Sequence, residues 1–223
     1  GGVEVEHRTI VMPGPIRHHV LQVGLRYQPW LDGHTVFGRV VIAGVYHPAV
    51  VLAIAVDLWP GRALEVSDVQ FYRVVVLDAG VDPEVHVVFT PVDGADAYRF
   101  EIASAPDQGV GEWIVHARGR VALTGAALGA VPGPAALLAL TDREFDPVFA
   151  RREQARTRIG WSPTWWWIRS LRVGADAAVA ELEATVADAL AWGPIHPALL
   201  DNAVGAALMP NIGSGREPVA PVP

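Results

Sequence analysis

The segment from Trp30 to Gly44, WLDGHTVFGRVVIAG, decides the fold and holds the first candidate for chemistry. The turn residues Asp32 and Gly33 precede His34, and the β-branched run at residues 39–42 follows it, which predicts a histidine held near the end of a strand. Imidazole has an unperturbed pKa of about 6.5, so it is suited to take a proton near neutral pH. The alternative is a purely structural role for His34.

Downstream of this segment, the pattern predicts one buried helix followed by several strands. Residues 46–58 are apolar and stop at Trp59-Pro60-Gly61, which predicts a buried core helix. Four segments rich in Val, Phe and Tyr predict strands and are separated by Asp- and Gly-containing turns: residues 66–77, 84–91, 97–105 and 113–123. Strands around one buried helix favour an α+β fold.

The second half of the chain repeats this theme after a break in composition. Residues 124–140 are rich in Ala, Gly, Pro and Leu, which places a boundary there. Beyond it we expect a charged helix at 144–158, interrupted near Pro147, strands at 165–173 and 177–185, and an apolar helix at 197–208. The predicted units are residues 1–125, a linker at 126–142, residues 143–212, and a flexible Pro/Gly-rich tail at 213–223.

The second candidate for chemistry is Asp201, which lies within the otherwise apolar window of the last predicted helix. A buried carboxylate costs several kcal/mol unless it is paired, hydrogen-bonded or protonated. Burial would raise the pKa of Asp201 and suit it to act as a general acid. The alternative is that Asp201 faces solvent beside Asn202. Acid-base work shared with His34 requires both side chains to face one cavity.

Composition excludes several other functions. The formal net charge of −7, with both signs scattered along the chain, gives no basic field for nucleic acid or anionic lipid. The histidines lack metal-ligand spacing, no Gly-rich phosphate loop occurs, and the chain has no cysteine. No apolar run is long enough to span a membrane, so we expect a cytoplasmic protein. We assign the tryptophans at 165–167 to core and interface packing.

Taken together, residues 7–209 resemble the dehydratase domains of modular polyketide synthases. His34 and Gly38 match the HxxxGxxxxP motif of that family, with Ala43 where the proline belongs. GWSPTW at 160–165 stands in the place of GYGPxF. HPALLD at 196–201 matches the opening of the last motif, DxxxQ/H, which here ends at Gly205.

This resemblance implies a double hotdog fold, in which two fused units each wrap a curved antiparallel sheet around a central helix. It implies a β-hydroxyacyl or enoyl substrate on the phosphopantetheine of an acyl carrier protein, neighbouring synthase domains such as a ketosynthase, and no other cofactor or metal. His34 would remove the α-proton and Asp201 would protonate the β-hydroxyl. Further substrate contacts are expected at six positions: Gly38, Ala43, Gly44, Trp161, Pro163 and Gly205.

Three departures from the family pattern leave the reaction open. Trp161 replaces a tyrosine and Gly205 replaces a glutamine or histidine, so two polar groups that would orient Asp201 or the leaving hydroxyl are missing; Ala43 also changes the turn beside His34. The alternatives to dehydration are a ketosynthase-associated branching domain, a cyclase, an isomerase, or a non-catalytic scaffold. The sequence does not indicate the oligomeric state.

Overall fold

The computed structural model describes residues 7–78, 80, 82–105, 111–125, 132–187 and 189–208. The predicted tail at 213–223 lies outside the described residues, as do residues 126–131 of the predicted linker and the last four residues of the second predicted unit.

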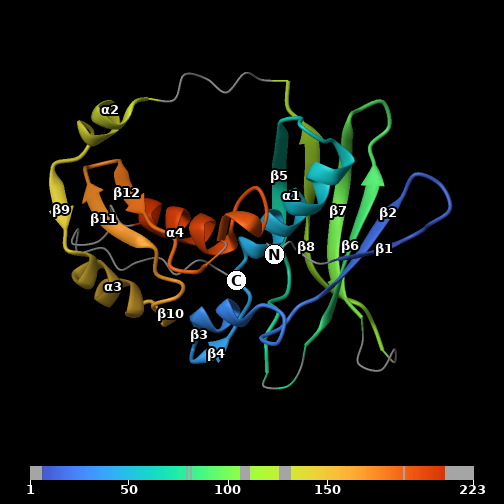
Figure 1. Ribbon diagram of the computed structural model, residues 1–223, viewed down its shortest axis with the longest axis horizontal. Coiled ribbons are helices and arrows are strands. Elements are labelled where there is room, and N and C mark those ends of the chain that lie inside the picture. Colours follow the sequence, from blue (N-terminus) through green and yellow to red (C-terminus); the bar gives the residue numbers. More distant parts are fainter. Residues whose placement is uncertain are drawn as a thin grey trace.

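One large antiparallel sheet dominates the first half of the chain (Figure 1). Its strands lie in the order β1 (Arg8–Ile10), β2 (Arg17–Gln22), β6 (Glu84–Pro91), β7 (Ala97–Ser104), β8 (Ile114–Leu123) and β5 (Leu64–Phe71). Helix α1 (Tyr46–Leu58) packs against β5 and β8, and its residues Ala49, Val51 and Ile54 are completely buried. The helix predicted at 46–58 is therefore confirmed, and it forms the centre of the core.

Strand β5 is shorter than predicted. It ends at Phe71 instead of residue 77, and its register with β8 shifts between Ser67 and Gln70, where Asp68 has a φ of 55°. A bulge of this kind bends the strand and increases its twist. Tyr72 still donates its N–H to His116 O of β8; beyond it the chain leaves the sheet edge, and Val75 O accepts the backbone N–H of Ile42.

The second half carries a smaller sheet, in the order β12 (Ala178–Leu182), β11 (Ile168–Val173) and β9 (Arg143–Phe145). Helix α4 (Pro197–Leu208) packs against β12, as the apolar pattern at 197–208 predicted. Two short helices, α2 (Pro134–Leu138) and α3 (Pro147–Ala155), lie at the outer side of this half in Figure 1.

Two predicted boundaries in this half are wrong. Pro147 begins α3 instead of interrupting a longer helix, because the first helical residue needs no hydrogen-bonded N–H and proline presets its φ. The strand predicted from residue 165 starts at Ile168, because residues 162–165 form a turn in which the N–H of Trp165 donates to Ser162 O.

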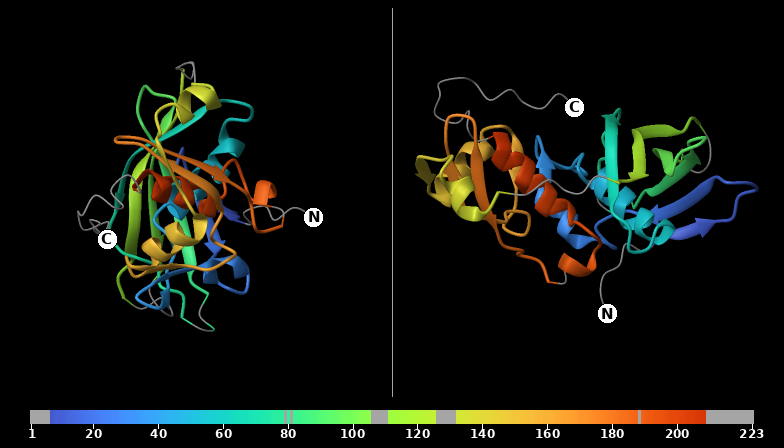
Figure 2. Two further views of the ribbon diagram at one scale, coloured as in Figure 1. Left: turned by 90° about the vertical axis from the view of Figure 1, so that its left-hand side faces the viewer. Right: turned by 90° about the horizontal axis from the view of Figure 1, so that it is seen from above.

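A third, small sheet joins the two halves. It pairs β10 (Ile159–Trp161) with β3 (His34–Val36), which continues into β4 (Arg39–Val40). The turn between β3 and β4 has only two residues, Phe37 and Gly38, with φ values of 51° and 78°, as in a type I′ hairpin. The helices α1 and α4 also meet at this junction, which lies between the two larger sheets when viewed from above (Figure 2).

Candidate active site

His34 lies where the 3-10 helix η1 (Pro29–Gly33) passes into β3, and its imidazole is held by Val41, in the segment between β4 and α1. Its Nδ1 lies 2.7 Å from Val41 O, while the N–H of Val41 donates to His34 O at 3.1 Å. A carbonyl oxygen can only accept, so Nδ1 carries the proton. In the neutral ring this leaves the lone pair on Nε2, which is the atom that faces the second half.

Asp201 faces His34 from the second turn of α4. The distance between His34 Nε2 and Asp201 Oδ2 is 4.0 Å, and the two side chains are 8% and 16% exposed. The structure thus brings the two candidates together, each from a different half of the chain. This distance is longer than a direct hydrogen bond, so the lone pair of Nε2 is not engaged in a hydrogen bond with the carboxyl group.

Burial raises the pKa of the Asp201 carboxyl. Two nearby groups oppose this effect: the imidazole of His34, and the indole of Trp165, whose Nε1–H donates to Oδ2 at 2.8 Å. The Trp165 ring also packs against the His34 ring, with centroids 5.4 Å apart. A carboxyl with a raised pKa beside an imidazole with a free Nε2 can deliver one proton while the ring takes another.

Sequence reasoning missed two residues that hold this pair. We assigned Trp165 to packing alone, but it also fixes the orientation of Asp201. Asn202, which was placed beside a solvent-facing Asp201 in the alternative reading, is completely buried. Its Oδ1 accepts the N–H of Trp167 at 3.0 Å, and its Nδ2 donates to Trp165 O and Ala198 O, each at 2.7 Å. Asn202 therefore joins the segment of tryptophans at 165–167, called the tryptophan segment below, to α4 through hydrogen bonds.

His196, the first residue of the HPALLD segment, has a structural role. Its Nδ1 accepts the N–H of Ala198 at 3.1 Å, which caps the start of α4. Burial lowers the pKa of His196 to about 4, so the ring is neutral at physiological pH. With Tyr27, Trp30 and Trp192 it lines an aromatic pocket, and Trp30 connects this pocket to Trp165, with ring centroids 5.6 Å apart.

The other predicted contact residues fall into two groups. Gly38 and Pro163 are exposed, and both serve turns: Gly38 the β3–β4 hairpin and Pro163 the turn at 162–165. Ala43 is buried in the core at the approach to α1, and Gly44 is exposed at the start of that helix, where a Cβ would lie 3.5 Å from the Phe71 ring.

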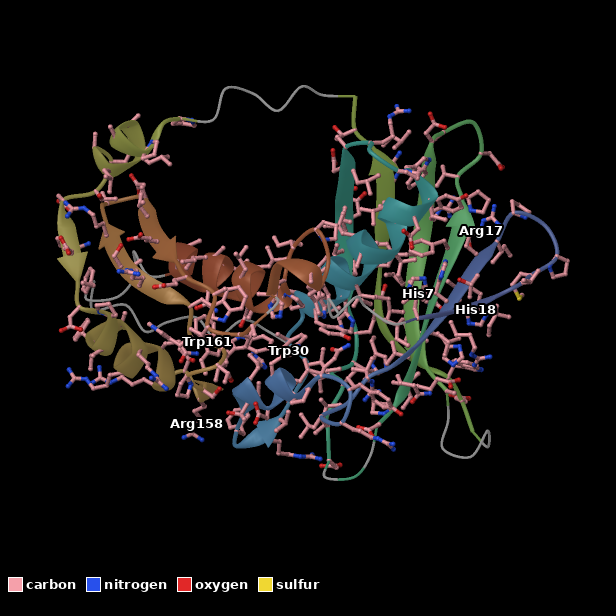
Figure 3. The ribbon with its side chains drawn as sticks, viewed as in Figure 1. His7, Arg17, His18, Trp30, Arg158 and Trp161 are labelled. Atoms are coloured by element: carbon pink, nitrogen blue, oxygen red, sulfur yellow. The ribbon has the colours of Figure 1, made fainter. Side chains whose placement is uncertain are left out.

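Trp161 and Gly205, by contrast, lie against each other beside the pair. Trp161 is the register partner of His34, and Gly205 lies one turn after Asp201 on α4. Trp161 is 8% exposed, and Figure 3 shows it beneath α4. The departures from the family pattern at these two positions are thus adjacent in space.

Within the described residues, no helix is long and apolar enough to cross a membrane.

Comparisons with known proteins connect this geometry to a family. The family model described as polyketide synthase dehydratase domain matches residues 12–105. Polyketide synthase GfsB of Streptomyces halstedii is 28% identical over 204 residues, which cover 88% of this chain but only 4% of that protein. The chain therefore spans a small part of the length of this relative.

Solved structures match over nearly the whole chain. The dehydratase domain from the CurF module of curacin polyketide synthase has a TM-score of 0.83 at 22% identity, covering 92% of this chain and 76% of that chain. The CurK dehydratase domain has a TM-score of 0.83 at 20% identity, covering 94% and 75%. A structure from work on dehydratase substrate selection for the borrelidin and fluvirucin synthases has a TM-score of 0.72 at 25% identity, covering 90% and 72%.

The likeness confirms the predicted α+β double hotdog fold, with α1 and α4 as the two central helices. The sequence match over residues 12–105 and the shared fold over both halves together show that the chain is similar to the dehydratase domains of polyketide synthases.

Proposed function

We propose that this domain dehydrates a β-hydroxyacyl chain carried on the phosphopantetheine of an acyl carrier protein. His34 Nε2 takes the α-proton, the electron pair of that C–H bond forms the α,β double bond, and the β C–O bond breaks. Asp201 gives its proton to the departing hydroxyl, which leaves as water. The resulting imidazolium and carboxylate exchange one proton, which restores both groups, so the reaction needs no metal, redox cofactor or external acid.

The observation that carries this proposal is the arrangement of the pair across the junction. Nε2 and Oδ2 are 4.0 Å apart, and the bond from Nδ1–H to Val41 O leaves Nε2 as the basic atom. The carboxyl is the group whose burial favours the protonated form. An elimination of water requires one base with a free lone pair and one acid, and burial shifts the Asp201 carboxyl towards its acid form.

The relatives support the same assignment. Two structures of CurK dehydratase, with TM-scores of 0.83 and 0.80, are described as inactive mutants, one with asparagine in place of an aspartate and one with phenylalanine in place of a histidine. A histidine and an aspartate are also the pair that this chain brings together. The similarity to polyketide synthase dehydratase domains supports an acyl carrier protein and neighbouring synthase domains as partners.

The purified domain, incubated with a β-hydroxyacyl and separately with an α,β-unsaturated acyl carrier protein and followed by intact-protein mass, tests the reaction. We expect a loss of about 18 Da, one water, from the hydroxyacyl form. A mass gain of the same size from the unsaturated form alone would instead support hydration, as in a cyclase. No change with either substrate would refute acid-base turnover and favour a scaffold.

Single substitutions test the two roles. His34→Ala and Asp201→Asn should each abolish turnover, and full activity in either variant would remove that residue from the mechanism. His18→Ala and Asp142→Asn are matched controls, because His18 lies on β2 of the large sheet and Asp142 pairs with Arg143 on β9, at the edge of the sheet formed by β12, β11 and β9. Both controls should keep turnover.

A further inference from the structure

Trp161 shares a sheet face with His34. The two residues are directly opposite in the antiparallel pairing of β10 with β3. Opposite residues in such a pair carry their side chains on the same face, with Cβ atoms about 4.5–5.5 Å apart. The indole of Trp161 therefore lies on the face from which His34 reaches Asp201.

The far edge of the same indole rests on α4. Gly205 follows Asp201 by four residues, so both lie on one face of the helix. A Cβ at position 205 would lie 2.5 Å from Cη2 of Trp161, which is closer than side chains allow. The indole thus fills the space that any side chain at 205 would need, and the absence of one at Gly205 is what admits the tryptophan.

The indole nitrogen has an unused donor. Trp161 Nε1 is buried and has no hydrogen-bond partner in the described part of the chain. Most buried donors in folded proteins are paired, because an unpaired one loses its hydration without compensation. Trp165 and Trp167, its neighbours in sequence, both have partners for their indole N–H groups. The side chain that carries this donor lies between the strand paired with that of His34 and the helix of Asp201.

We propose that Trp161 is a substrate-orienting residue, whose Nε1–H donates a hydrogen bond to the β-oxygen of the acyl chain and holds it beside Asp201, and that Gly205 is required to give the indole its place. This rests on the proposed function, which supplies an acyl chain with a β-oxygen. The side chain of Trp161 then fills the space left free at position 205, and its N–H is the one hydrogen-bond donor in place of the polar groups expected at positions 161 and 205. The β-oxygen accepts a hydrogen bond from a donor that has no partner among the described residues, so the site favours chains that carry this oxygen.

Binding can be measured without turnover in an Asp201→Asn background. Isothermal titration calorimetry would compare two pantetheine amides of equal chain length, one with a β-hydroxyl and one saturated chain without it. We expect the hydroxyacyl amide to bind about tenfold more tightly, as for one neutral hydrogen bond. Trp161→Phe keeps an aromatic ring against Gly205 but removes the donor, so the ratio of the two affinities should fall towards one.

Two further variants separate orientation from general packing. Trp59→Phe is the matched control, since Trp59 packs on Tyr98 at the far end of α1, and it should keep the ratio. Gly205→Ala should lose the ratio by displacing the indole, and it should cause no further loss when combined with Trp161→Phe, whose smaller ring clears the added methyl group.

The outcomes distinguish this inference from the function on which it rests. An unchanged affinity ratio in Trp161→Phe, with the parent domain still dehydrating its carrier-bound substrate, overturns the role of Trp161 and leaves the proposed reaction intact. Equal weakening of both amides in that variant shows packing alone and also overturns it. No binding of either amide, together with no turnover by the parent domain, overturns both proposals.

Discussion

Asn202→Ala tests whether the tryptophan segment is fastened to α4 as the structure indicates. The change removes an acceptor for the N–H of Trp167 and a donor for the carbonyl of Trp165, and the side chain it removes is completely buried. Two backbone groups would be left without these partners. At about 1–3 kcal/mol for each unsatisfied buried group, allowing for relaxation, we expect a loss of about 3 kcal/mol in the free energy of unfolding.

For a chain of this size, that loss corresponds to a fall in Tm of about 6–12 °C. Differential scanning calorimetry measures it, and Val204→Ala is the control, because Val204 is exposed on the same helix and should change stability by no more than about 0.5 kcal/mol. We also expect kcat to fall, since Trp165 would no longer hold Asp201 in place. A Tm within 2 °C of the parent, by an estimate from the same scaling, would refute the reasoning.

Three further predictions concern single positions around the site. Asp201→Asn should stabilise the domain relative to the parent at neutral pH. Burial raises the pKa of Asp201 in the folded state, so the parent is most stable below the unfolded-state pKa of this group and loses stability as pH rises through its folded-state pKa. Parallel urea titrations of the parent and the variant across this pH range should therefore diverge as pH rises. Trp165→Phe removes a hydrogen bond that lowers the pKa of Asp201, so the limb of the pH–rate profile that reports its ionisation should move to higher pH, whereas a shift to lower pH would contradict the assignment. Gly38→Ala should cost about 1 kcal/mol in a urea unfolding assay, because φ is positive in the hairpin, but should leave turnover unchanged since a Cβ there meets nothing within 4 Å.

The sequence predicted those features that depend on local periodicity. The bounds of α1 coincide with the apolar segment at 46–58, and α4 begins at residue 197 as predicted, because proline and glycine close the first helix and precede the second. Strand β6 likewise matches the predicted segment at 84–91. His34 and Asp201 could be singled out because a histidine beside a turn and a carboxylate in an apolar helix are unusual without a reason.

The features that could not be predicted depend on contacts between the two halves. The bonds of Asn202 join α4 to a segment 35 residues or more earlier in the chain, and no local pattern reports them. An asparagine in an apolar helix is a signal of the same kind as Asp201, but the sequence left open that Asp201 faces solvent beside Asn202, and only the structure shows that Asn202 is buried. Trp161 and Gly205 each look like a lost polar group in sequence, and only the packing of one against the other shows that the two changes are complementary.

The small sheet that joins β3 to β10 also has a consequence for how the domain folds. The hydrogen bond from the Thr35 hydroxyl to Gly160 O closes a loop of 125 residues. Strand β3, which carries His34, pairs with β10 only when this loop is closed. Loop-closure entropy must be paid before such distant contacts contribute, so they form late and slow the overall rate. The geometry of the candidate site is thus expected to appear in the last kinetic phase of refolding, after the large sheet has collapsed around α1.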